Sequence, residues 1–72
     1  MKKVVYVPKR DVNKQAIGYI WESLHARICG LQRIALLLAK EQLGHAGGFK
    51  DVKFSFDLSQ DCYIVELELY ED

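Results

Sequence analysis

The feature that most constrains this chain is a stretch of about 30 residues, Val12 to Leu43, in which apolar residues recur at helical spacing. A helix of that length spans on the order of 45 Å, whereas strands of about 8 residues reach only about 26 Å. The remainder of a 72-residue chain cannot supply a sheet that covers such a helix. The helix therefore overhangs the sheet or breaks, and Gly30 is the expected break point, because glycine inside a helix costs about 1 kcal/mol relative to alanine. We expect an unbroken or bent helix whose uncovered surface meets a partner.

The segments on either side of this helix have the patterns of strands. Lys3 to Val7 is a β-branched run that Pro8 ends, and the missing N–H of proline places this strand at an edge. Residues 52–58 and 63–69 alternate apolar with polar side chains, which is the period of strands with one buried face. Asp11 or Asn13 is the expected N-cap of the helix.

The helix is expected to end at Gly44, and His45 to Gly48 form the following loop. Residues 1–72 are thus predicted to form a single β-α-β-β domain of the α+β class. In this domain a three-stranded antiparallel sheet, with strand order 1-3-2, packs against one long helix.

The apolar sets of the last two strands share a face if opposed residue numbers sum to 121. The predicted pairs are Leu58 with Tyr63, Phe56 with Val65, Phe54 with Leu67, and Lys53 with Glu68. The first strand then brings Lys2 and Lys3 beside Glu71 and Asp72 at the ends of the chain.

Composition is typical of a small intracellular protein. Half of the residues are hydrophobic, which suffices for one core, although cores of this size are marginal and often rely on oligomerisation. Cys29 and Cys62 make a poor disulfide framework, and the chain begins Met-Lys-Lys-Val without an apolar signal region. The longest purely apolar run, Ile34 to Ala39, is far shorter than the roughly 20 residues that span a bilayer. We expect a reduced, cytoplasmic protein with no membrane segment.

The net charge is zero, yet the charges are divided unevenly along the chain. Residues 1–40 carry eight Lys or Arg against two acids, and residues 41–72 carry two Lys against eight acids. This asymmetry favours intramolecular neutralisation. The functional alternatives are a basic arm for nucleic acid and an acidic strand face for a basic partner. The acidic face would comprise Asp57, Glu66, Glu68, Glu71 and Asp72.

Two apolar faces are predicted on the helix. The stripe that covers the sheet follows steps of four and three residues and comprises Ile17, Trp21, Leu24, Ile28, Leu31, Ala35 and Leu38. A neighbouring strip has small side chains in its middle, which allow two helix backbones to approach closely. We interpret this strip, Tyr19, Ser23, Ala26, Gly30 and Leu37, as a self-association interface. The alternative is a solvated flank that tolerates small residues.

Arg27 is unusual because it projects from the apolar face of the predicted helix. An unpaired buried guanidinium costs several kcal/mol, so Arg27 needs a carboxylate, reaches water along its stem, or lies in the overhang. A contact with a partner is the further alternative, and we include Arg27 in the candidate interface on that basis.

No catalytic signature is found. His25 and Cys29 are four residues apart on one helical face, but a metal site needs three or four ligands, and neither Cys62 nor His45 stands at a recognisable spacing. No glycine-rich phosphate loop, nucleophile elbow or paired-carboxylate arrangement appears. We therefore expect no enzyme, no metal and no cofactor.

Two functions remain open. The favoured one is a non-enzymatic protein-binding module, a homodimer through its helix, that regulates or inhibits another protein in the manner of small phage or accessory-genome proteins. The alternative is a nucleic-acid binder that uses Lys9, Arg10 and Lys14 in the basic N-terminal part of the chain. Zero net charge counts against that alternative.

Overall fold

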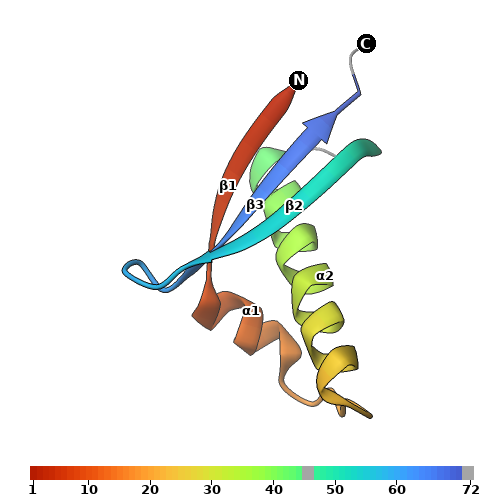
Figure 1. Cartoon of the computed structure of the whole chain (residues 1–72), viewed down its shortest axis with the longest axis vertical. Helices are drawn as coiled ribbons and strands as arrows, with labels where there is room; N and C mark the ends of the chain where they lie inside the picture. Colours follow the sequence, from red (N-terminus) through yellow and green to blue (C-terminus); the bar gives the residue numbers. More distant parts are fainter. Residues whose placement is uncertain (45–46, 71–72) are drawn as a thin grey trace.

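The computed structural model describes residues 1–44 and 47–70 of the chain. In a single antiparallel sheet the third strand of the chain lies between the first and the second, and two helices lie on one face of the sheet (Figure 1). The predicted α+β class and the central position of the third strand are confirmed. The helical region differs from the prediction, because it is divided into a short helix and a long one. The elements in chain order are β1 (Lys2–Pro8), α1 (Lys9–Ala16), α2 (Leu24–Leu43), β2 (Phe49–Asp57) and β3 (Cys62–Leu69).

α1 begins directly after β1. Pro8 is its N-cap, with φ −57° and ψ 135° and no side-chain cap. The backbone N–H of Lys9 instead donates to the carbonyl oxygen of Asp61 in the β2–β3 turn, at 3.0 Å. A tertiary contact thus satisfies one of the donors that a helix start leaves free. The prediction of an N-cap at Asp11 or Asn13 is wrong, since both residues lie inside α1.

The break between the helices falls at Gly18 to Ser23 and not at Gly30, which lies within α2. Gly18 has φ +94°, a conformation that a residue with a side chain rarely adopts. Ser23 is extended, and its Oγ accepts the N–H of Ala26 at 3.1 Å, which caps α2. The predicted end of α2 is confirmed, because Gly44 adopts the left-handed conformation there. The predicted loop includes residues 45 and 46, which lie outside the described residues.

The core lies between the sheet and the C-terminal half of α2. Ala35 and Ala39 are fully buried, and their small side chains let the helix approach the strands closely. Val12 of α1 is fully buried in the same cluster, which ties the short helix to the core. The other buried members come from β1 and β3, namely Val5, Val7, Val65, Leu67 and Leu69.

The register of β2 on β3 differs from the prediction by two residues. Phe56 lies opposite Tyr63, Phe54 opposite Val65, and Val52 opposite Leu67. A shift of two keeps every side chain on its face, so the alternation pattern does not distinguish the two registers. Lys53 consequently lies opposite Glu66 and not opposite Glu68.

The turn explains this register. One carboxylate oxygen of Asp57 accepts the backbone N–H of Ser59 at 3.0 Å, the Ser59 hydroxyl at 2.7 Å and the N–H of Gln60 at 3.3 Å. These bonds start the turn at Asp57, which leaves Leu58 at its tip, 87% exposed. Leu58 therefore has no strand partner, contrary to the prediction.

The register of β1 on β3 also corrects a prediction about charge. Lys2 lies opposite Glu68 and Lys3 opposite Leu67. The predicted neighbours Glu71 and Asp72 lie outside the described residues. Lys2 thus still faces a carboxylate on β3, in keeping with neutralisation between the two halves of the chain.

Candidate protein-binding surface

α2 extends past the sheet that it covers. It has 20 residues and is therefore about 30 Å long, whereas three strands about 4.8 Å apart make a narrow sheet. Figure 1 shows the C-terminal end of α2 behind the strands and its N-terminal part continuing beyond β2. The overhang expected from the sequence is present even though the helical region is divided.

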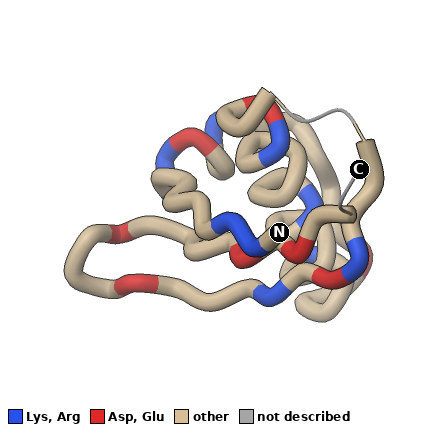
Figure 2. Tube along the Cα trace, turned by 90° about the horizontal axis from the view of Figure 1, so that it is seen from above, with Lys and Arg blue, Asp and Glu red and all other residues tan. Residues whose placement is uncertain are grey.

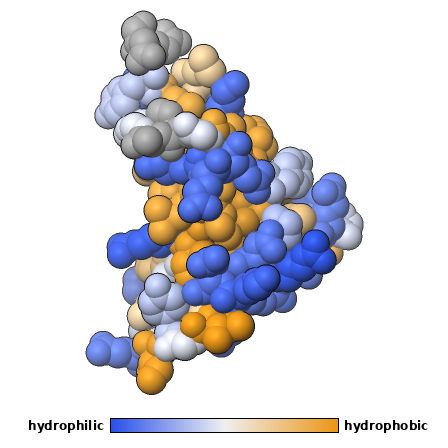
Figure 3. All heavy atoms as spheres, turned by 180° about the vertical axis from the view of Figure 1, so that it is seen from behind, coloured by the Kyte–Doolittle hydropathy of each residue, from blue (hydrophilic) through white to orange (hydrophobic). Residues whose placement is uncertain are grey.

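The overhanging part carries large apolar side chains that the chain leaves in solvent. Leu24 is 72% and Ile28 48% exposed, although both lie on the helical stripe that becomes core further along α2. In the linker between the two helices, residues 17–23, Ile17 is 80% exposed and Ile20 is 94% exposed. We call these four residues the overhang surface. Figure 3 shows hydrophobic side chains along the middle of the helical face and again at its lower end. The prediction that the whole stripe covers the sheet is wrong for its N-terminal half.

Trp21 accounts for the small residue in the middle of the predicted interface. Its indole ring lies against Gly30 so closely that a Cβ at that position would overlap two ring atoms. Tyr19 stacks on the same indole, with ring centroids 5.4 Å apart and planes 20° apart. The close approach at Gly30 is thus made by the chain's own linker and not by a second helix.

The other members of the predicted strip have separate roles. Ser23 caps α2, and Ala26, which supplies the capped N–H, is half-buried. Tyr19 and Leu37 remain exposed and line one shallow groove between the linker and α2. The remaining residues of that groove are Gln15, Ile34, Leu38 and Glu41. The structure therefore brings together the two ends of the predicted strip but closes its middle.

Arg27 is exposed, in the part of α2 that overhangs the sheet. Of the alternatives that the sequence allows, this placement agrees with an arginine that reaches water. Arg27 stands one residue before Ile28 of the overhang surface, so a protein that covers that surface would meet a positive charge at its border.

The basic residues of the alternative function lie on α1. Lys9, Arg10 and Lys14 are all exposed, and Asp11 lies among them. Arg10 lines a groove with Asp61 of the β2–β3 turn. Figure 2 shows Lys and Arg interspersed with Asp and Glu along the chain trace. This arrangement is typical of local charge balance, whereas phosphate binding favours a continuous basic patch.

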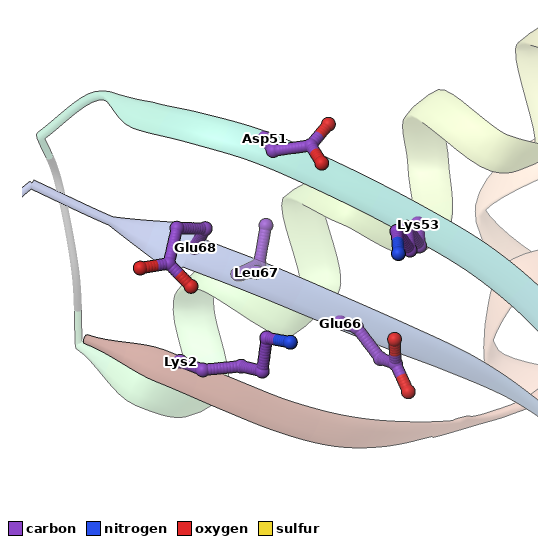
Figure 4. A pocket seen from close by; sticks show the side chains of 6 residues that line it. All are labelled: Lys2, Asp51, Lys53, Glu66, Leu67 and Glu68. Atoms are coloured by element: carbon purple, nitrogen blue, oxygen red, sulfur yellow. The ribbon is translucent and has the colours of Figure 1, made fainter.

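The open face of the sheet carries mixed charges near one end. A shallow pocket there is lined from all three strands, and Lys2 lies beside the carboxylates of Glu66 and Glu68 in Figure 4. The other lining residues are Asp51, Lys53 and Leu67. The predicted acidic face is therefore interrupted by two lysines. Its members Glu71 and Asp72 lie outside the described residues.

His25 and Cys29 do come together, as their spacing indicates. The Cys29 Sγ lies 3.6 Å from the His25 Nε2 on the exposed side of α2. Cys62 is on β3 and its thiol donates to the carbonyl oxygen of Gln60 at 3.3 Å. Within residues 1–44 and 47–70, no three His, Cys, Asp or Glu side chains are grouped to hold a metal ion. His45 lies outside the described residues.

No helix in the part of the chain that the structure describes is long and apolar enough to cross a membrane. Comparisons of the chain with protein-family models, with curated proteins and with solved structures gave no match in any of the three. The apolar periodicity predicts that three residues of the overhang surface, Ile17, Leu24 and Ile28, cover the sheet, whereas the structure leaves them exposed. Gly18 followed by a serine N-cap five residues later was the signal for the helix break that exposes it.

Proposed function

We propose that this chain is a small, non-enzymatic protein-binding module of the cytoplasm that forms a homodimer through α2 and its linker and regulates or inhibits another protein. The observation that carries the proposal is the overhang surface. Ile17, Ile20, Leu24 and Ile28 are large apolar side chains grouped at one end of the molecule, each about half exposed or more. Large apolar side chains that a small protein leaves exposed near one another support an interaction site there.

The surroundings of the surface suit a protein partner. The stacked Tyr19 and Trp21 lie in the same linker and offer aromatic contacts, which are enriched at interfaces. Arg27 supplies a polar border, and interfaces typically have an apolar centre with a polar rim. Small domains with marginal cores gain stability by burying such surfaces in an oligomer.

The oligomeric state in solution tests the proposal. Light scattering or sedimentation at micromolar concentration should give a mass near twice the 8.3 kDa of one chain. Leu24→Asp should weaken association, because a charge would be buried among apolar groups. Leu58→Asp is the matched control, since it places the same charge on an exposed leucine at the hairpin tip. A mass of 8.3 kDa at every concentration overturns the homodimer.

The regulatory part is tested separately by using the chain as bait in extracts of its native host. A target that binds wild type and Leu58→Asp but not Leu24→Asp supports a role for the overhang surface in target binding. A target that binds all three equally places target binding elsewhere and removes that role.

A further inference from the structure

β2 is the open edge of the sheet. In the strand order β1-β3-β2, among the described residues, no strand pairs with the outer side of β2. The edge at β1 is partly covered, because Gln42 Nε2 of α2 donates to the carbonyl oxygen of Tyr6 at 3.5 Å and Pro8 ends the strand. β2 contains no proline and is nine residues long. Such an edge is a template for adding another strand.

The hydrogen-bond alternation identifies which groups point outward. In antiparallel pairs only every second residue hydrogen-bonds to a given neighbouring strand. The backbone N–H of Leu69 donates to the carbonyl oxygen of Met1 at 2.7 Å, so the odd-numbered residues of β3 bond to β1 and the even-numbered ones bond to β2. The register then directs the backbone groups of Lys53 and Ser55 toward β3 and those of Val52, Phe54 and Phe56 outward. The outward N–H of Val52 donates to its own neighbour, the carboxylate of Asp51, at 2.9 Å.

The overhang of α2 lies beneath the place where an added strand would run. Gln32 of α2 lines a groove with Phe54 and Phe56 of β2, so the helix passes under β2 at that point. The part of α2 before Gln32, with Leu24 and Ile28, continues past the edge (Figure 1). A strand added to β2 would extend the sheet over these exposed side chains.

The charges of β2 are complementary to those of a second β2. On the open face Asp51 lies opposite Glu68, a like-charge pair within the chain, while Lys53 lies opposite Glu66. When two antiparallel copies of β2 pair about Val52, Asp51 of each copy faces Lys53 of the other. Both Asp51–Lys53 pairs across the dimer then join opposite charges, and the lysine of the second copy offsets the Asp51–Glu68 repulsion.

We propose that two copies of this chain join β2 to β2 in antiparallel orientation, giving one continuous six-stranded sheet with Val52 at the two-fold axis. The two three-stranded sheets become one, and the overhanging part of each α2 covers the β2 of the other copy. Leu24 and Ile28 of each copy, which are exposed in the single chain, then lie beneath the β2 of the other copy. This inference rests on the proposed homodimer and names the strand through which it forms.

Charge reversal on β2 tests the pairing. Asp51→Lys places two lysines face to face across the dimer, and Lys53→Asp places two aspartates there. Each change should raise the dissociation constant at least about tenfold, because like charges across an interface are strongly unfavourable. An equimolar mixture of the two variants should recover dimers close to wild-type affinity, since the heterodimer restores both opposite-charge pairs. Arg33→Asp, at an exposed position of α2, is the control and should leave the mass unchanged.

Amide hydrogen exchange gives a second readout that needs no variant. Exchange of the N–H groups of Val52 and Phe54 should slow by more than about tenfold as the concentration rises through the dissociation constant, because paired edge amides are protected. This readout stays decisive if Lys53→Asp fails to fold beside Glu66.

The outcomes separate this inference from the proposed function. A monomer at every concentration overturns both. In a second outcome, Leu24→Asp dissociates the dimer, but neither charge reversal weakens it and the Val52 and Phe54 amides stay unprotected. That outcome overturns β2 pairing and keeps the homodimer. Recovery in the mixed sample together with edge protection supports the six-stranded sheet.

Discussion

The indole ring of Trp21 lies directly on Gly30, nine residues along the chain, and fills the space that any larger side chain at that position would occupy. This contact folds the linker back against α2 and, through the stacking of Tyr19 on Trp21, orders the segment between the two helices. The glycine in the middle of the helix therefore serves packing within the chain.

Replacing Gly30 with alanine should displace the Trp21 ring. An isolated helix would gain about 1 kcal/mol from the change, but here the gain is offset because the indole loses its packing site. We expect a red-shifted tryptophan emission and no increase in the free energy of unfolding. Cys29→Ala, at the adjacent exposed position, is the control and should leave the emission unchanged. An unshifted emission with raised stability would show that the contact contributes nothing.

Ser23 controls where α2 begins. Its Oγ accepts the Ala26 N–H, and loss of a serine N-cap typically costs about 1 kcal/mol. Ser23→Ala should lower the free energy of unfolding by roughly that amount, measured by urea denaturation, whereas Ser23→Asp should retain most of the stability. If the serine mattered only as a small residue at an interface, alanine would be the better tolerated of the two.

The sequence predicts the sheet well because its signals are local and consistent. Alternating apolar residues in β2 and β3, together with Pro8 at the end of β1, are sufficient for an antiparallel sheet with the third strand in the centre. Gly44 marks the end of α2 for an equally local reason, since glycine adopts the left-handed conformation more readily than residues with a side chain.

The remaining features depend on contacts that periodicity does not encode. The β2–β3 register is set by the hydrogen bonds of Asp57, and a shift of two residues leaves the apolar pattern unchanged. The helix break at Gly18 was obscured because Ile17 and Trp21 continue the apolar stripe across it. The role of Gly30 depends on the position of Trp21, which requires that break.

Asp57 should make stability depend on pH in the acid range. The hydrogen bond from the Ser59 hydroxyl, followed by the N–H groups of Gln60 and Ser59, lowers the pKa of its carboxyl below the usual aspartate range, although desolvation acts in the opposite direction. A lowered folded-state pKa contributes stability above the unfolded pKa, and that contribution is lost as the pH falls through the folded value.

The measurement compares urea midpoints of wild type and Asp57→Ala at neutral pH and below about pH 4, where aspartates protonate. The difference in stability between the two proteins should shrink in acid. Wild type loses the charged Asp57 carboxylate only when it protonates at low pH, whereas Asp57→Ala lacks that carboxylate at every pH. Other carboxylates titrate in both proteins and cancel. A difference that is constant with pH would show that the turn does not depend on the charge of Asp57.

The choice between a protein and a nucleic acid as ligand is decided by two sets of variants. Lys9, Arg10 and Lys14 are exposed on α1, and a nucleic acid bound there would release counterions from its phosphates, so neutralising all three should cut affinity and flatten its salt dependence. For a protein ligand held by the helical surface, that triple variant should bind normally. Tyr19→Ala and Leu37→Ala should then each cost about 1 kcal/mol or more, as expected for interface anchors.

Titration with mixed DNA and RNA at low salt is the direct measurement. We expect weak binding that the triple variant barely alters, since Asp11 and Asp61 lie among these basic residues. Tight, salt-sensitive binding by wild type that is lost in the triple variant would instead identify the protein as a nucleic-acid binder.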